Sequence, residues 1–181
     1  MKGLVFTELV EFVEQSCGME VADRMISESN LPSGGVYTAV GTYDHKEIIE
    51  LLTTLVKITG QPPNVLLKAF GGHLHGRFVA AYPDFFTQAG NLFNFLESIE
   101  GHIHVEVRKL YPDAELPTFN YERPATDKLV MIYRSTRGMA DLAEGLIEAA
   151  VMHFKEPVQL SREDKVPDAL STRFTLQQLR A

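Results

Sequence analysis

A change of hydrophobic period near Pro112 is the feature that most limits what this chain can fold into. Before it, apolar residues recur at spacings of three and four, which is the period of amphipathic helices. After it, apolar and polar residues alternate in short runs, which is the period of half-buried strands. A chain of 181 residues that is helical first and strand-rich later predicts an α+β fold.

The part of the chain before this change, residues 1–111, predicts a helical lobe. Its periodic segments end where proline and glycine interrupt the sequence, for example at LPSGG (31–35) and GQPP (60–63). The helices are expected over residues 2–17, 19–29, 44–59, 63–80, 84–99 and 102–111.

The part after the change, residues 112–181, predicts a four-stranded antiparallel sheet that carries one helix. A short turn over residues 124–127 is expected to join the first two strands. The strands are LPTFNYE (116–122), KLVMIYRST (128–136), PVQLSRE (157–163) and TRFTLQQL (172–179), and the helix is GMADLAEGLIEAAVMHF (138–154). No internal repeat divides the chain, so we expect one domain over residues 1–181.

Composition excludes several classes of protein. The formal net charge of −7 argues against general binding to nucleic acid or to anionic membranes. The acidic, amphipathic start has no signal-peptide pattern, and no apolar run is long enough to span a bilayer. A single cysteine, Cys17, excludes an internal disulfide framework, which fits a cytoplasmic location.

Motifs for nucleophilic catalysis and for nucleotide binding are absent. Cys17 has no histidine near it in sequence, and the chain contains no GxSxG elbow. The paired glycines at 34–35 and 71–72 match neither a phosphate-binding loop nor a dinucleotide fingerprint. Turns and close helix packing are their simpler interpretation.

Two His-x-His pairs, His73 with His75 and His102 with His104, are the candidate metal ligands. On a strand, each pair would point both imidazoles at one face, but on a helix residues two apart diverge by about 200°. Both pairs lie in helical surroundings, so a metal centre built on all four is the minor interpretation. His104 borders the apolar side of its helix and is expected to point inward, either as a ligand or as a core histidine satisfied by a carbonyl.

The stretch KLVMIYRSTRG (128–138) begins as a buried strand and ends in hydrogen-bonding groups. Tyr133, Ser135 and Arg137 are spaced by two, so a strand would place them in one row spanning roughly 13 Å. Two hydroxyls and a guanidinium suit a ligand that carries two carboxylates. The alternative is a strand end that simply becomes exposed to solvent.

These two segments together resemble the H-NOX family, the haem nitric oxide/oxygen binding domain related to the haem domain of soluble guanylate cyclase. The resemblance is carried by His104 in IHVEVRKLYPDAELPTF, followed by Tyr133, Ser135 and Arg137 in YRSTR. The start MKGLVF and the FG at 70–71 also fit, so the resemblance covers essentially the whole chain.

The resemblance implies a haem b cofactor held between the two lobes. It implies that His104 is the proximal ligand of the haem iron and that Tyr133, Ser135 and Arg137 bind the haem propionates. Pro117 matches the proline that presses on the macrocycle and distorts it. Some bacterial relatives bind zinc through cysteines in the C-terminal lobe, which this chain lacks, so haem is the sole cofactor expected.

The resemblance also assigns a distal pocket, formed by Leu142, Leu74 and Val5. Relatives that hold oxygen stably donate a hydrogen bond from a distal tyrosine, whose position here falls on Leu142. An apolar pocket is therefore expected to bind nitric oxide, and also carbon monoxide, with weak or no binding of oxygen. Tyr82 stays the alternative donor if the alignment shifts.

The function implied is a gas sensor without catalytic activity. Nitric oxide is expected to break the bond between iron and His104, to change the orientation of the lobes and so to regulate a separate signalling protein, a histidine kinase or a cyclic-di-GMP enzyme. Two alternatives stay open at this point: a non-haem metalloenzyme that uses the paired histidines, and a haem carrier.

Overall fold

The change from helix to strand predicted near Pro112 is present in the computed structural model, which describes residues 1–179. None of the helices in this range combines the length and the apolar character needed to cross a bilayer. The helices of the first part are α1 (Gly3–Cys17), α2 (Met19–Ser27), α3 (His45–Thr59), α4 (Pro63–Ala81), α5 (Pro83–Ala89), α6 (Leu92–Ser98), the π-helix η1 (Ile99–Ile103) and α7 (His104–Leu110).

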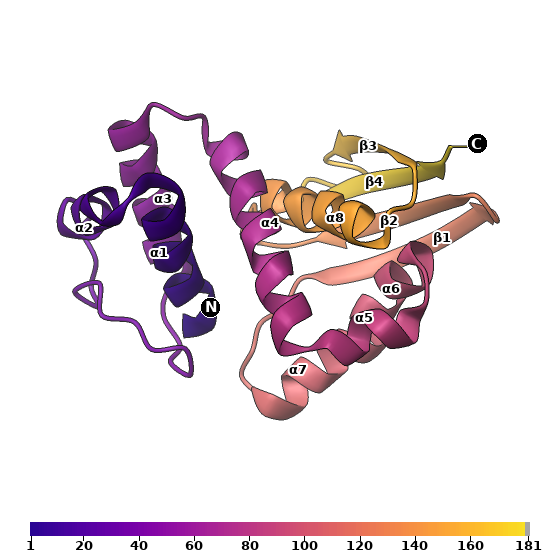
Figure 1. The fold of residues 1–181 in the computed structure, drawn as a ribbon, viewed down its shortest axis with the longest axis horizontal. Coiled ribbons are helices and arrows are strands. Elements are labelled where there is room, and N and C mark those ends of the chain that lie inside the picture. Colours follow the sequence, from indigo (N-terminus) through magenta and orange to yellow (C-terminus); the bar gives the residue numbers. More distant parts are fainter. Residues whose placement is uncertain (180–181) are drawn as a thin grey trace.

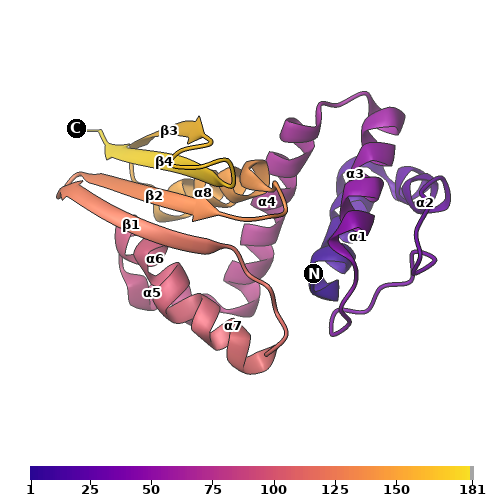
Figure 2. The same ribbon diagram turned by 180° about the vertical axis from the view of Figure 1, so that it is seen from behind.

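The second part forms the predicted four-stranded antiparallel sheet with one helix. The strands are β1 (Thr118–Ala125), β2 (Lys128–Arg134), β3 (Val158–Asp164) and β4 (Ser171–Gln178), and the helix between β2 and β3 is α8 (Ala140–Phe154). The spatial order is β1-β2-β4-β3, so β2 and β4 are central. Helices α5 to α8 lie on one face of this sheet, and the opposite face is turned to the viewer in Figure 2 (Figures 1 and 2).

Two predicted boundaries in the helical part are wrong. The single helix expected over 84–99 is two helices, because Gly90 adopts a positive φ of 74° and ends α5. The side chain of Asn91 then caps α6 by accepting a hydrogen bond of 2.9 Å from the backbone N–H of Asn94. The helix expected from residue 102 begins earlier, as the π-helix η1, and changes to α-helix at His104.

The strand predicted over 128–136 ends at Arg134, so the row of side chains that we expected along it stops at Tyr133. Leu129, Met131 and Tyr133 do face the helices and are buried. Ser135 and Arg137 lie in the loop that follows. The strand β1 extends past its predicted end and includes Pro124, which an edge strand tolerates because one side of its backbone needs no partner.

Two hydrophobic cores meet at the contact between α4 and α8. The first core is formed by α1 to α4, with Phe6, Leu51 and Phe70 among its buried residues. The second lies between the sheet and helices α5, α6 and α8, with Phe93 and Phe174 fully buried. Helix α8 serves both cores, because Leu142 and Leu146 pack against the first while Ala143 and Ile147 belong to the second.

Glycines allow α4 and α8 to approach to backbone contact. A Cβ atom on Gly71 of α4 would lie 2.6 Å from the carbonyl oxygen of Leu142. A Cβ atom on Gly145 of α8 would lie 2.2 Å from the carbonyl oxygen of Lys68. Both distances are shorter than any normal contact and both neighbours are backbone atoms, so the crossing requires glycine at these positions.

We expect Gly145→Ala to lower the free energy of unfolding by about 1–3 kcal/mol or more, because the added methyl group must separate two packed helices. Gly76→Ala is the matched control in α4, where a Cβ would meet nothing within 4 Å. That variant should be stabilised by about 0.5–1 kcal/mol through helix propensity. Urea denaturation measures both, and equal effects of the two substitutions would contradict the close crossing.

Candidate functional site

A cavity of about 360 Å³ lies between the two cores, and its walls come from α1, α4, α7, α8 and the sheet. Most of its lining is apolar. The residues that the family resemblance assigned to the site all line this one cavity, although they come from elements far apart in the chain: Val5, Leu74, His104, Pro117, Tyr133, Ser135, Arg137 and Leu142. The polar members among them fall into two groups, described next.

His104 is the first polar group of the cavity. It begins α7 directly after the π-helix η1 and is buried, with 9% of its surface exposed. Its Nδ1 atom lies 3.0 Å from Oε2 of Glu100, one turn earlier. The partner of this buried histidine is therefore a carboxylate and not the backbone carbonyl considered from the sequence.

Glu100 joins three elements around His104. Its Oε1 atom accepts a hydrogen bond of 3.2 Å from Nη2 of Arg108, and its Oε2 atom accepts one of 3.3 Å from the backbone N–H of Phe119 in β1. Burial alone would raise the pKa of the Glu100 carboxyl, but the hydrogen bonds from His104 and Arg108 bring that pKa below its usual value. Glu100 is consequently an anion that can only accept hydrogen bonds.

This charge fixes the tautomer of His104. Burial lowers the pKa of the His104 imidazole, and Glu100 offsets that effect only in part, so the ring is neutral at pH 7. A neutral imidazole beside an acceptor must carry its proton on Nδ1. The lone pair on Nε2 is then free to bind a metal. Sequence reasoning missed Glu100, although the spacing of four residues between Glu100, His104 and Arg108 was a readable signal.

The second polar group is at the end of β2. Tyr133 is buried against the second core, and burial raises the pKa of its hydroxyl, which stays protonated as a donor. Ser135 accepts a hydrogen bond of 3.2 Å at Oγ from the backbone N–H of Arg137. The loop, not a straight strand, brings these side chains to the same edge of the cavity.

Arg137 is held by Glu115 in the segment before β1. Its Nη1 donates to the backbone carbonyl of Glu115 at 2.7 Å, and its Nη2 pairs with the Glu115 carboxylate. The Glu115 side chain is 82% exposed, so solvent weakens this ion pair. Arg137 can therefore exchange Glu115 for another carboxylate at low cost.

Apolar side chains from three helices form the wall away from these groups. Val5 comes from α1, Leu74 from α4 and Leu142 from α8. Tyr82 also lines the cavity, but it lies at the C-terminal end of α4 and is 40% exposed, which places part of its side chain in solvent.

His75 is a wall residue that sequence reasoning did not place here. It is buried, packs edge-on against Phe86 and His153, and its Nε2 atom has no hydrogen-bond partner among residues 1–179. Burial, with a smaller contribution from His153, lowers the pKa of His75 to about 4. The ring is therefore neutral at pH 7 and interrupts an otherwise apolar wall.

The two histidine pairs do not converge on a metal centre. His102 is exposed on η1, while His73 turns toward Glu8 of α1. Within residues 1–179, no three of the four paired histidines bring ring nitrogens within 4.8 Å of one another. The helical placement of both pairs is the reason, because their imidazoles diverge.

Comparisons with known proteins identify a family and several similar solved structures. A protein-family model described as Haem-NO-binding matches residues 2–162. The structure of the Fe(II) unliganded H-NOX protein from K. algicida is 38% identical, with a TM-score of 0.93, and the match covers 100% of this chain and 98% of that chain.

Two structures from Shewanella are also similar. The H-NOX from Shewanella woodyi in the Fe(II)CO ligation state is 35% identical, with a TM-score of 0.85 and coverage of 99% and 95% of the two chains. The H-NOX protein from S. oneidensis in the Fe(II)NO ligation state is 25% identical, with a TM-score of 0.89 and coverage of 99% and 100%. No curated protein sequence matches this chain.

Because the pKa of His75 is about 4 in the folded chain and near 6.5 in the unfolded chain, the unfolded state binds its proton first as the pH falls. We expect the free energy of unfolding to decrease between pH 6.5 and 4. In His75→Leu this component of the decrease should be missing, and the variant should be more stable at pH 7 by about 1–3 kcal/mol, since a buried unpaired nitrogen is removed.

His102→Leu is the control for this prediction, because it removes an exposed histidine and keeps His75, so the component of the decrease that comes from His75 should remain. Urea denaturation at a series of pH values makes the comparison. If the free energy of unfolding decreased equally with falling pH in the wild type and in His75→Leu, the lowered pKa of His75 would be contradicted.

Proposed function

Because this chain belongs to the Haem-NO-binding family, whose members are haem-binding sensor domains, we propose that it is a nitric oxide sensor that uses haem b and regulates a separate signalling protein. The observation that carries the proposal is one apolar cavity that joins a buried neutral imidazole to a guanidinium edge. Relatives described in NO and CO ligation states support gas binding as the input.

The residues of the cavity fit a haem. A haem is a flat apolar ring with one metal and two carboxylates, so it requires an apolar slot, a metal ligand and an anion-binding edge. The apolar walls supply the slot, His104 presents a free Nε2 lone pair, and Arg137 with its neighbouring hydroxyls supplies the edge. The metal ligand and the anion-binding edge belong to different elements, so both ends of such a ligand would be held.

Haem iron, when bound, supplies the centre to which a diatomic gas binds. His104 would be its protein ligand, oriented by Glu100 as carboxylates commonly orient metal-binding histidines. Tyr133, Ser135 and Arg137 would hold the propionates, with Arg137 exchanging Glu115 for a propionate. Pro117, which lines the same cavity, would press on the ring.

Release of His104 from the iron is the switch that we propose. Glu100 connects His104 to Arg108, one turn further along α7, and to β1 through the Phe119 amide, so a displacement of His104 would be passed to β1 as well as along α7. Tyr133, Ser135 and Arg137 would meanwhile hold the propionates, so the loop after β2 would stay attached to the cofactor. The two halves of the molecule then change orientation, which is the signal.

The wall favours nitric oxide over oxygen. Leu142, Leu74 and Val5 carry no hydrogen-bond donor to stabilise a partly anionic oxygen ligand, whereas nitric oxide binds without one. His75 does not change this expectation, because its Nε2 is covered by neighbouring atoms. Carbon monoxide would also bind.

The partner that we propose is a separate histidine kinase or cyclic-di-GMP enzyme, and the chain itself would carry no catalytic activity. The proposal follows the sensor character of the family. We also propose that the protein is located in the cytoplasm.

His104→Gly tests the metal ligand. The wild-type protein, reduced under nitrogen, should show the Soret band of ferrous haem, a shifted band with nitric oxide and no stable complex in air. His104→Gly should bind haem poorly, with occupancy lower by about tenfold or more, and added imidazole should restore it, because imidazole fills the space of the deleted side chain.

His102→Gly is the control and should keep the wild-type spectrum, since His102 is exposed. Absence of haem absorbance in the wild type after reconstitution would overturn the proposal. A stable oxygen complex would retain the haem and overturn the nitric oxide selectivity.

Glu100→Gln tests the positioning of His104. Replacing the carboxylate by a neutral amide should weaken the bond between His104 and iron, because Nε2 of the imidazole then donates less electron density to the metal. The iron–histidine stretching frequency, measured by resonance Raman spectroscopy, should decrease. Glu97→Gln, one turn earlier and paired with Arg123 instead, should leave it unchanged. An equal frequency in both variants would show that Glu100 only supports the local fold.

A further inference from the structure

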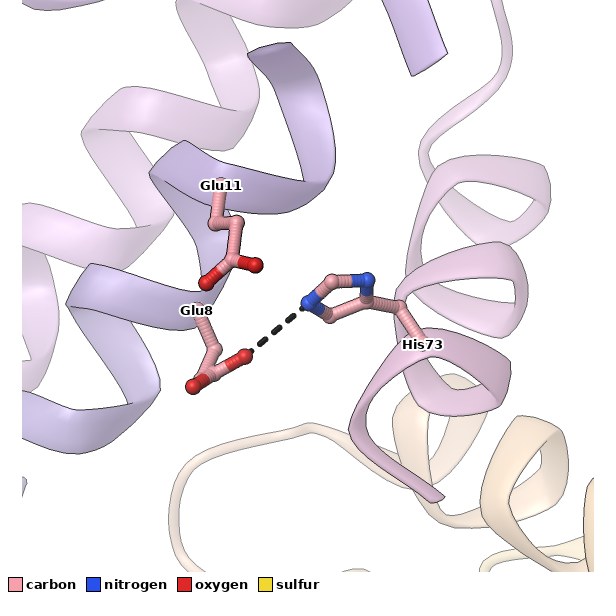
Figure 3. Close-up of side chains that lie close together, drawn as sticks. All are labelled: Glu8, Glu11 and His73. Carbon is pink, nitrogen blue, oxygen red and sulfur yellow. Dashed lines mark hydrogen bonds and ion pairs between the residues drawn. The ribbon is translucent and has the colours of Figure 1, made fainter. Parts of the chain in front are cut away.

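Outside the cavity, three potential metal ligands gather where α1 meets α4. Glu8 and Glu11 are three residues apart on α1 and so share one side of it, and His73 of α4 faces them (Figure 3). Their ligand atoms all lie within 4.8 Å of one another. The Nε2 atom of His73 is 3.0 Å from Oε2 of Glu8.

The charges at this point are not balanced. Glu8 is buried, and its carboxylate accepts bonds of 3.1 and 3.0 Å from Nε of Arg77. Glu11 accepts a hydrogen bond of 2.9 Å from Gln15, a neutral partner, and it has no ion-pair partner within residues 1–179. Two carboxylates therefore lie beside one guanidinium, and a further cation would be stabilised.

The surroundings strengthen the effect of this excess negative charge. The His73 ring packs against Phe12 and Phe70, at centroid distances of 5.7 and 6.4 Å. These rings keep water from one side of the cluster, so electrostatic interactions there are screened less than on an open surface. The His73 side chain is 11% exposed, which leaves a narrow route to solvent.

We propose that Glu8, Glu11 and His73 form a binding site for a divalent transition-metal ion such as Zn²⁺. One imidazole nitrogen and two carboxylate oxygens are ligands that Zn²⁺ accepts in proteins, with water in the remaining position. Nε2 of His73, which lies beside Glu8, would coordinate the ion, and the ring proton would then be carried by Nδ1. Arg77 must leave Glu8, which its half-exposed side chain permits.

The ion would connect this point to the wall of the cavity. Val5 lies three residues before Glu8 on α1, and Leu74 directly follows His73 on α4, and both line the cavity. A metal that bridges the two helices would fix these wall residues relative to each other. The proposal does not depend on which gas the cavity binds.

Isothermal titration of the haem-containing protein with ZnCl₂ tests the site. A Cys17→Ser background, without an affinity tag, removes the exposed thiol as a competing ligand. We expect one ion per chain and an affinity that decreases about tenfold or more in His73→Gln and in Glu11→Gln. Arg77→Gln should bind more tightly, because it removes the competing cation.

Glu14→Gln is the matched control, an exposed acidic residue of α1 outside the cluster. It should bind like the background protein. Circular dichroism checks that each variant is folded, and Glu11→Gln is the decisive one because Glu11 is less buried than Glu8.

Two outcomes would overturn the proposal: no binding by the background protein, or binding that His73→Gln and Glu11→Gln leave unchanged, which would mark an adventitious ion elsewhere. Neither outcome bears on the haem spectra, so failure of this site is distinct from failure of the nitric oxide proposal.

Discussion

The backbone contact between α4 and α8 is the constraint on which the rest of the structure depends. Gly71 and Gly145 remove the side chains that would hold the helices apart, and a methyl group at either position would meet a backbone carbonyl. The same two helices supply Leu74 and Leu142 to the cavity and divide the two cores. The cavity is therefore bordered by one contact that cannot widen without loss of packing and by segments held through polar groups, which can move more easily.

The polar groups of the cavity differ in how firmly they are held. His104 is bound to a partly buried carboxylate that has two further partners, so its orientation is well defined before any ligand arrives. Arg137 is paired with an exposed carboxylate, and such a pair contributes about 0–1 kcal/mol. The His104 end of the site is thus preorganised, and the Arg137 end can exchange Glu115 for another carboxylate.

Helix α1 is joined to its neighbours by both apolar and charged contacts. Phe6 and Leu9 are buried in the first core, and Glu8 meets His73 and Arg77 on α4. At its start, Lys2 reaches Asp113 at 3.1 Å, next to the segment that carries Pro117. The apolar contacts hold α1 in the first core, and the charged contacts join it to α4 and to the segment before β1.

The sequence by itself determined the fold class, the antiparallel sheet with its helix, and the inward direction of His104, because hydrophobic period and turn residues act locally. The YRSTR motif also identified Tyr133, Ser135 and Arg137 as neighbours at one cavity. Periodicity alone placed Ser135 and Arg137 wrongly, on a straight strand that in fact ends at Arg134. Only the tertiary structure decided that the Phe119 amide also binds Glu100, that Arg137 pairs with Glu115 and that Nε2 of His75 has no partner within residues 1–179. These contacts depend on chain segments that meet after folding: β1 against η1, the loop after β2 against the segment before β1, and α4 against α8. Local sequence carries no direct record of such distances.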